Sequence, residues 1–221
     1  MMTDNESRDG DSSEHDWLKQ GSTSSEDVEK SYDQWADSYD ETLATWDYRS
    51  PGDAAGLLRG QVAPSSDILD AGCGTGLTGA ALRAAGFTGA IDGLDLSQSS
   101  LDEAAKHDVY GTLRQANFQE LPLDIPADTY DALFCIGVLT YVPESDAILT
   151  EFARLVRQGG TVLVSMRDDL FLERQFGDIV RGLTDTGIFR DFNISEPHPY
   201  LPGNPEFGDA IKVFYISLSV V

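Results

Sequence analysis

The stretch Ile68-Leu69-Asp70-Ala71-Gly72-Cys73-Gly74-Thr75-Gly76-Leu77-Thr78-Gly79 determines the fold class expected for this 221-residue chain. Its short apolar run predicts a buried strand over 67–70. The glycines that follow allow a sharp turn and let a ligand approach the main chain. A helix is expected over about 78–85, and the free N–H groups of its first turn suit an anionic part of a ligand.

Strands and helices alternate on the C-terminal side of this turn. The hydrophobic pattern predicts strands over 90–94, 113–116, 130–136 and 161–166, and helices over about 97–106, 145–156 and 170–183. Two further strands are expected near the end, over 188–194 and 210–220, with a proline-rich joint between them. This order predicts an α/β fold, a largely parallel sheet with helices on both faces.

The residues before the turn predict a helical cap and a tail. Ser25 has the chemistry of an N-cap, and a helix is expected from there to about Asp40, followed by a second helix over about 52–62. Residues 1–24 are rich in Asp, Glu, Ser, Thr and Gly, which is typical of a disordered acidic tail. The expected organisation is therefore one domain over 25–221, with a helical cap at about 25–62.

The glycine turn alone does not identify the ligand. Gly74-x-Gly76-x-x-Gly79 matches a dinucleotide fingerprint, and Asp95 follows Gly76 by nineteen residues at the end of the second strand, where a carboxylate can accept from ribose hydroxyls. No Gly-Lys-Ser/Thr follows, which excludes a P-loop. No second mononucleotide-binding half is present either, which favours S-adenosylmethionine, one nucleoside with a short anionic tail, and leaves an NAD-dependent oxidoreductase as an alternative.

The segment 67–166 resembles class I S-adenosylmethionine-dependent methyltransferases. Four runs correspond to the motifs of that family: Asp70-x-Gly72-x-Gly74-x-Gly76, Leu94-Asp95-Leu96-Ser97, Tyr130-Asp131-Ala132-Leu133, and Leu155-Val156-Arg157-Gln158-Gly159-Gly160, where Gln158 replaces a proline. The resemblance implies a Rossmann-like fold with a seven-stranded sheet, the last strand antiparallel. It places the cofactor over the carboxyl ends of the first, second and fourth strands.

A closer resemblance lies outside this core. Tyr32-Asp33-x-Trp35-Ala36-x-x-Tyr39-Asp40, Tyr48-Arg49-Ser50-Pro51 and Tyr200-Leu201-Pro202-Gly203 are similar to segments of the Williams–Beuren-syndrome-region methyltransferase-like family. This resemblance places Tyr32 and Tyr39 beside the cofactor. Aromatic faces near a sulfonium would contribute about 0.5–2 kcal/mol by cation–π attraction.

The expected cofactor contacts gather at the strand ends and on the cap. They are Tyr32, Tyr39, Arg49, Asp70, Gly72, Cys73, Gly74, Gly76, Asp95, Leu96, Asn117, Phe118 and Ile136. Asp95 is expected to bind the ribose and Arg49 the methionine carboxylate. Asp70 is either a direct contact or an orienting residue, Asn117 either an adenine partner or a turn residue, and Phe118 either a stacking or a core residue.

A general base is optional, because a sulfonium is already a good leaving group and the protein mainly has to position the acceptor. The candidates for a base are His198, Tyr141, Asp168 and Asp40, while Thr140 stands where relatives often carry histidine. Cys73 and Cys135 are expected to be packing residues. No Cys/His cluster has the spacing of metal ligands, so no metal is expected.

The net charge limits the partners. Thirty-eight acidic against 15 basic residues give −23, which opposes binding to nucleic acid. It fits either an acidic coat in a salty cytoplasm or a basic partner, so a basic protein substrate stays open. No membrane segment is expected. The leading hypothesis is a cytoplasmic methyltransferase for a small molecule, and a non-catalytic S-adenosylmethionine-binding regulatory module is the alternative.

Overall fold

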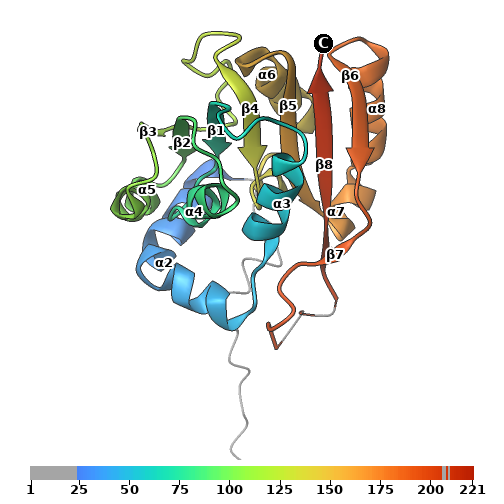
Figure 1. The fold of residues 1–221 in the computed structure, drawn as a ribbon. Helices are drawn as coiled ribbons and strands as arrows, with labels where there is room; N and C mark the ends of the chain where they lie inside the picture. The colour runs from blue at the N-terminus through green and yellow to red at the C-terminus, as the bar shows by residue number, and fades with distance from the viewer. Residues whose placement is uncertain (1–23, 206–207, 209) are drawn as a thin grey trace, which may run out of the picture.

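The computed structural model describes residues 24–205, 208 and 210–221. Its centre is a single mixed sheet with the strand order β3-β2-β1-β4-β5-β8-β6, and the short β7 pairs with β8 (Figure 1). The strands are β1 (Ile68–Ala71), β2 (Ile91–Asp95), β3 (Leu113–Gln115), β4 (Tyr130–Cys135), β5 (Val156–Arg167), β6 (Phe189–Ile194), β7 (His198–Pro199) and β8 (Lys212–Val220).

Strands β1 to β5 are parallel, and β8 is antiparallel to both β5 and β6. The predicted Rossmann-like α/β fold with seven strands and an antiparallel last strand is confirmed. The two-residue β7 is an addition within the proline-rich joint. The chain order reverses between β1 and β4, where crevices for ligands form at the carboxyl ends of the strands.

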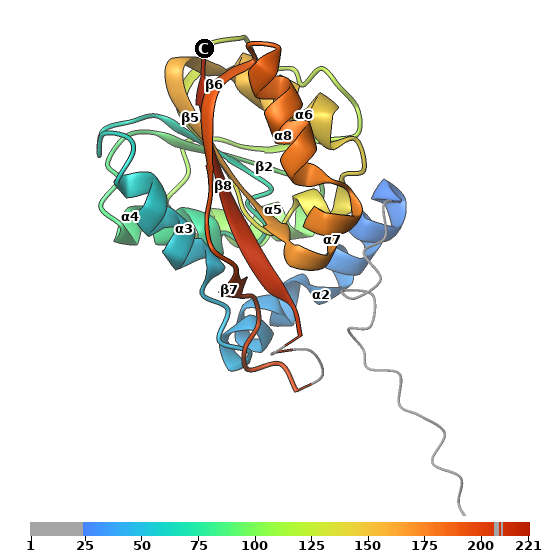
Figure 2. The same cartoon turned by 90° about the vertical axis from the view of Figure 1, so that its right-hand side faces the viewer.

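Helices cover both faces of the sheet, α3 and α4 on one side and α6 and α8 on the other (Figure 2). The helical segments are α2 (Ser25–Thr45), α3 (Ser50–Arg59), α4 (Leu77–Ala84), α5 (Gln98–Ala104), η1 (Ala105–His107), η2 (Leu139–Tyr141), α6 (Ser145–Leu155), α7 (Asp168–Glu173) and α8 (Phe176–Asp185). Leu58, Leu82 and Phe134 belong to the apolar core of one face, and Phe152, Phe176 and Leu218 to that of the other. Burial of these side chains on both faces explains why the central strands are apolar throughout.

Several boundaries differ from the sequence-based expectation. Strand β5 begins at Val156 instead of residue 161, and α3 covers Ser50–Arg59 instead of about 52–62. The first helix is capped by Ser24, whose side chain accepts from the Asp27 N–H at 3.3 Å, and it runs past Asp40 to Thr45 because Leu43 is buried against Leu201. The helix expected over 170–183 is two helices, α7 and α8. They are separated at Gln175, whose φ of 51° interrupts the helical conformation.

The helix α2 lies along the lower edge of the sheet in Figure 1, at the end opposite the C-terminus. That edge is formed by the carboxyl ends of the parallel strands, so α2 covers the place where the ligand is expected. The expected disordered tail, residues 1–24, lies outside the described residues except for Ser24. In the described part of the chain, no helix combines the length and apolarity that crossing a membrane requires.

Candidate functional site

The glycine turn after β1 has a backbone that other residues adopt only at a cost. Gly72, Gly74 and Gly76 have φ angles of 81°, 52° and 101°. A Cβ atom at Gly72 would lie 2.2 Å from Cγ2 of Val138, whereas one at Gly74 would meet no heavy atom within 4 Å. The turn therefore packs tightly against the segment after β4 at Gly72. At Gly74, by contrast, no other heavy atom occupies the space into which a side chain would project.

Asp95, at the end of β2, holds the turn. Its Oδ2 accepts from the Gly74 N–H at 2.8 Å, and its Oδ1 accepts from the Ser97 N–H at 2.9 Å. Burial raises the pKa of Asp95, and the backbone N–H groups oppose part of that rise. Each carboxylate oxygen has more than one lone pair, so both can accept a further hydrogen bond from a ligand hydroxyl.

Asp70 lies behind the turn. It is fully buried, and its Oδ2 accepts from the hydroxyl groups of Thr78 at 2.7 Å and Tyr110 at 2.8 Å. Burial raises the pKa of Asp70 to about 7, and the two hydrogen bonds offset part of the rise. Its Oδ1 has no hydrogen-bond partner. Asp70 thus connects the end of β1 to Thr78 at the start of α4 and to Tyr110.

One pocket gathers most of the predicted cofactor residues at the carboxyl ends of β1, β2 and β4. The predicted residues that line it are Tyr32, Tyr39, Gly72, Gly74, Asp95, Leu96, Asn117, Phe118 and Ile136. Of the four candidate bases, Tyr141 alone is among the lining residues. Residues that the sequence analysis missed also line it: Ser25, Val28, Glu29, Ser97, Ala116, Gln119, Gly137, Val138 and Val142. Three of them, Ser25, Val28 and Glu29, lie on α2, and their helical spacing from Tyr32 is the sequence signal that points to them.

Four predicted cofactor residues do not line this pocket. Asp70, Cys73 and Gly76 belong to the buried side of the turn, and burial raises the pKa of the Cys73 thiol. Arg49 is exposed and forms a bidentate ion pair with Asp47, so its side chain is engaged elsewhere. The free thiol of Cys135 is buried as well, in agreement with a packing role.

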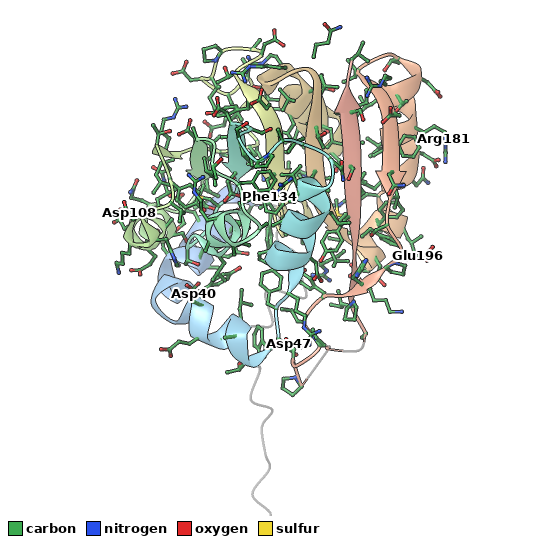
Figure 3. All side chains as sticks on the ribbon, in the orientation of Figure 1. Asp40, Asp47, Asp108, Phe134, Arg181 and Glu196 are labelled. Atoms are coloured by element: carbon green, nitrogen blue, oxygen red, sulfur yellow. The ribbon has the colours of Figure 1, made fainter. Side chains whose placement is uncertain are left out.

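The other three candidate bases lie outside the pocket. Asp168 accepts from the Lys212 N–H at 2.9 Å at the start of α7, and the His198 ring lies 5.2 Å from that of Tyr215. Asp40 accepts from the Thr75 hydroxyl at 2.5 Å. Figure 3 shows Asp40 on α2 at the lower end of the molecule, on the far side from Arg181 on α8. Asp40 thus fastens α2 to the glycine turn.

The loop after β3 uses its polar groups within the protein. Asn117 Nδ2 donates to Glu120 Oε1 at 3.0 Å, and its Oδ1 accepts from the Gln119 N–H at 3.0 Å. Phe118 packs edge-to-face on Phe152, with ring centroids 5.9 Å apart, and belongs to the core. Both residues line the pocket wall while they make these contacts within the protein.

Polar side chains of α2 bind the loops that surround the pocket. Asp33 accepts from the Ser97 hydroxyl at 2.5 Å, and Glu29 accepts from Gln115 Nε2 at 2.9 Å. With the Asp40–Thr75 bond, these contacts connect α2 to the ends of β1, β2 and β3. Val28, Tyr32 and Tyr39 of the same helix line the pocket. The helix is therefore a cover over the site, with its polar groups bound at the rim.

The lining suits S-adenosylmethionine better than a dinucleotide. Among the described lining residues, the charged ones are Glu29 and Asp95, and neither Lys nor Arg is present. A sulfonium and an ammonium would meet acidic and aromatic groups there, whereas a pyrophosphate would have only main-chain N–H groups of the turn beside two carboxylates. Asp95 is available to ribose hydroxyls, the main chain at Gly74 is open, and Leu96, Ala116, Phe118 and Val142 give apolar walls for a base.

Known proteins agree with this geometry. Residues 68–160 match the family model described as Methyltransferase domain. Methyltransferase-like protein 27 of Homo sapiens is 40% identical over 113 residues, 49% of this chain and 45% of that protein. Ubiquinone biosynthesis O-methyltransferase of Dechloromonas aromatica (strain RCB) is 36% identical over 104 residues, 44% of this chain and 43% of that protein. The chain thus spans less than half the length of these relatives.

A solved structure supports the fold over a longer range. The crystal structure of a SAM-dependent methyltransferase, possible histamine N-methyltransferase, from Thermotoga maritima has a TM-score of 0.62 at 15% identity and covers 85% of this chain and 97% of its own. At this identity the likeness shows the fold alone. Together with the family match, the glycine turn and Asp95, it leads to one conclusion: the chain has the fold of S-adenosylmethionine-dependent methyltransferases, and its residues 68–160 match a methyltransferase domain.

Proposed function

We propose that the chain binds S-adenosylmethionine in the pocket under α2 and transfers its methyl group to a small-molecule acceptor. One observation supports this most directly: the pocket joins a carboxylate at the end of β2, Asp95, to the main chain at Gly74 and to Tyr32 and Tyr39 of α2, with no cation in the described lining. In addition, both curated relatives described above are methyltransferases by name.

Each part of the pocket then has a role in binding. Asp95 accepts from the ribose hydroxyls, and the turn at Gly72 and Gly74 faces the amino-acid part of the cofactor. The main chain at Ile136 holds the ammonium group, and Leu96 and Phe118 enclose the adenine. Tyr32 and Tyr39 lie over the sulfonium, where an aromatic face contributes about 0.5–2 kcal/mol.

The bound cofactor supplies a methyl group on a sulfonium, which is a good leaving group. The protein's own contribution is to hold an acceptor atom in line with the departing sulfur and to exclude water. Positioning of this kind supplies up to about 7–11 kcal/mol in ideal intramolecular cases. This fits a pocket in which Tyr141 is the one candidate base and in which burial raises the pKa of that phenol.

A small-molecule acceptor fits the charge of the chain. A net charge of −23 opposes nucleic acid, and the relative from Dechloromonas aromatica is named for ubiquinone biosynthesis, which is small-molecule chemistry. A basic protein acceptor is the alternative that the same charge permits. Fractionation of labelled products decides between the two acceptors, since label in small metabolites supports our proposal and label in protein contradicts it.

The binding test is calorimetry with S-adenosylmethionine and with NAD. We expect saturable binding of S-adenosylmethionine alone, weakened by about 1–3 kcal/mol in Asp95→Ala, because polar partners lose a hydrogen bond. Asp178→Ala, on the distant α8, is the matched control and should bind as the wild type does. Binding of NAD alone would support an oxidoreductase. Binding of S-adenosylmethionine with no labelled product in any extract fraction would support a regulatory module.

A further inference from the structure

One arginine, Arg174, binds the main chain of the segment that follows β4. Its Nη1 donates to the carbonyl oxygens of Leu139 at 2.9 Å and Val142 at 3.0 Å, and its Nη2 donates to that of Thr140 at 2.8 Å. These carbonyls belong to the short helix η2 and to the residue that ends it. A single guanidinium therefore holds the main chain on both sides of Tyr141.

The segment depends on such partners because η2 is a single turn. A 3-10 helix of three residues is tight and has hydrogen bonds of poor geometry, so it has little internal support. The carbonyl oxygen of Tyr141 also accepts from a side chain, Gln119 Nε2, at 3.1 Å. The side chains of Arg174 and Gln119 thus bind every carbonyl oxygen from residue 139 to residue 142.

Arg174 is half-buried at the joint between α7 and α8, on the face of the sheet that also carries α6 (Figure 2). Within the part of the chain that the structure describes, it forms no ion pair with a carboxylate. Carbonyl oxygens at the end of a helix carry a partial negative charge and attract a cation. The guanidinium is thus used for the main chain, in contrast to that of Arg49, which pairs with Asp47.

The segment that Arg174 holds is a wall of the cofactor pocket. The lining residues that come from the stretch 136–142 are Ile136, Gly137, Val138, Tyr141 and Val142. The Tyr141 hydroxyl accepts from the Tyr32 hydroxyl of α2 at 3.3 Å, and the two rings lie edge to face with their centroids 5.8 Å apart. The same segment is therefore also a contact for the helix that covers the pocket.

We propose that Arg174 is a positioning residue of the methyl-transfer site: by fixing the main chain around Tyr141, it places that side chain in the pocket wall and keeps α2 in contact with it. This inference rests on the proposed function, because the pocket is the one to which we assign S-adenosylmethionine. Arg174 is not among the described lining residues, so it acts on the ligand through Tyr141 and α2. The planar fork of a guanidinium, with five N–H donors, suits a task that requires several carbonyls to be bound at once.

The test measures how fast labelled S-adenosylhomocysteine is released from Arg174→Met and from Arg154→Met. Arg154 is the matched control, because its guanidinium also donates to two loop carbonyls, those of Leu123 at 3.1 Å and Ile125 at 2.9 Å, and neither residue is in the described lining. Both variants lose hydrogen bonds to the main chain, so both should lose stability. We expect release to be about tenfold faster in Arg174→Met and unchanged in Arg154→Met. Equal release rates from the two variants would overturn the inference.

A double-mutant cycle tests whether Arg174 acts through Tyr141. Tyr141→Phe removes the hydroxyl that accepts from Tyr32. If Arg174 positions this side chain, Arg174→Met should accelerate release less in the Tyr141→Phe background than in the wild type. Equal acceleration in both backgrounds would contradict this route. Amide exchange gives a second measurement, since Arg174→Met should increase exchange in α2 and Arg154→Met should not.

A milder variant covers the case in which Arg174→Met fails to fold. Arg174→Lys keeps the charge, but a compact ammonium does not match three carbonyls as the planar guanidinium does, so release should still be severalfold faster than in the wild type. If only this variant folds, an unchanged release rate overturns the inference. Wild-type protein that binds no S-adenosylhomocysteine contradicts the proposed function, and amide exchange in α2, which needs no ligand, then decides the inference. Binding by the wild type with equal release from Arg174→Met and Arg154→Met contradicts the inference alone.

Discussion

Replacing Gly72 by alanine tests whether the turn requires glycine for packing as well as for backbone conformation. The φ of 81° costs an alanine about 1–2 kcal/mol. The new Cβ would lie 2.2 Å from Cγ2 of Val138, and overpacking of this kind costs about 1–3 kcal/mol. We therefore expect Gly72→Ala to lower the free energy of unfolding by about 2–5 kcal/mol.

Gly74→Ala is the matched control, because its φ is 52° but its Cβ would meet no heavy atom within 4 Å. Only the backbone cost of about 1–2 kcal/mol should appear, together with weaker cofactor binding, since this Cβ would enter the pocket. Urea unfolding of both variants and of Gly72→Ala/Val138→Ala measures the difference. Two results would contradict this explanation. One is that Gly72→Ala costs no more than Gly74→Ala. The other is that Gly72→Ala costs as much stability in a Val138→Ala background as it does in the wild type.

Three further predictions follow from individual contacts. Burial raises the pKa of Asp70 from 3.8 to about 7, so the folded state binds more protons between these values, and wild-type stability should fall as pH rises from about 4 to 7 relative to Asp70→Asn; parallel urea curves for both proteins across that range would contradict this. Asp40→Asn should loosen α2, with faster amide exchange in the helix and severalfold faster release of S-adenosylhomocysteine, whereas Glu41→Gln on the exposed side should change neither; equal release rates for the two variants would remove Asp40 from the cover. Arg49→Ala should leave cofactor affinity within twofold by calorimetry, because Arg49 is exposed and paired with Asp47; a tenfold loss would return it to the site.

The local parts of the site could be predicted from sequence. Strands and glycine turns depend on neighbours along the chain, so β1, the turn at Gly72 and Gly74, and the position of Asp95 were predicted before any contact was known. Asp95 follows because the carboxyl ends of adjacent parallel strands meet at one edge of the sheet.

Two predicted site residues, Arg49 and Asn117, have hydrogen-bond partners within the protein that the sequence pattern does not indicate. Arg49 was expected to bind a carboxylate of the ligand, yet Asp47, two residues away, binds it instead. Asn117 has both hydrogen-bonding functions needed for adenine, but Glu120 and the Gln119 N–H use them. These partners lie two or three residues away along the chain, so the local backbone conformation selects them, and composition does not contain that conformation.

The α/β order, the glycine turn and the carboxylate at the second strand end follow from residue patterns alone, because backbone conformation and hydrophobic periodicity are short-range properties. The position of α2 over the pocket depends instead on long-range contacts, the hydrogen bonds of Asp33 with Ser97 and of Asp40 with Thr75. Packing also brings Tyr32 to Tyr141 and Tyr48 to Tyr200, with ring centroids 5.8 Å and 5.7 Å apart. These groups come from segments up to about 170 residues apart, from Tyr32 to Tyr200, and only packing of the helices and loops around the sheet brings them together.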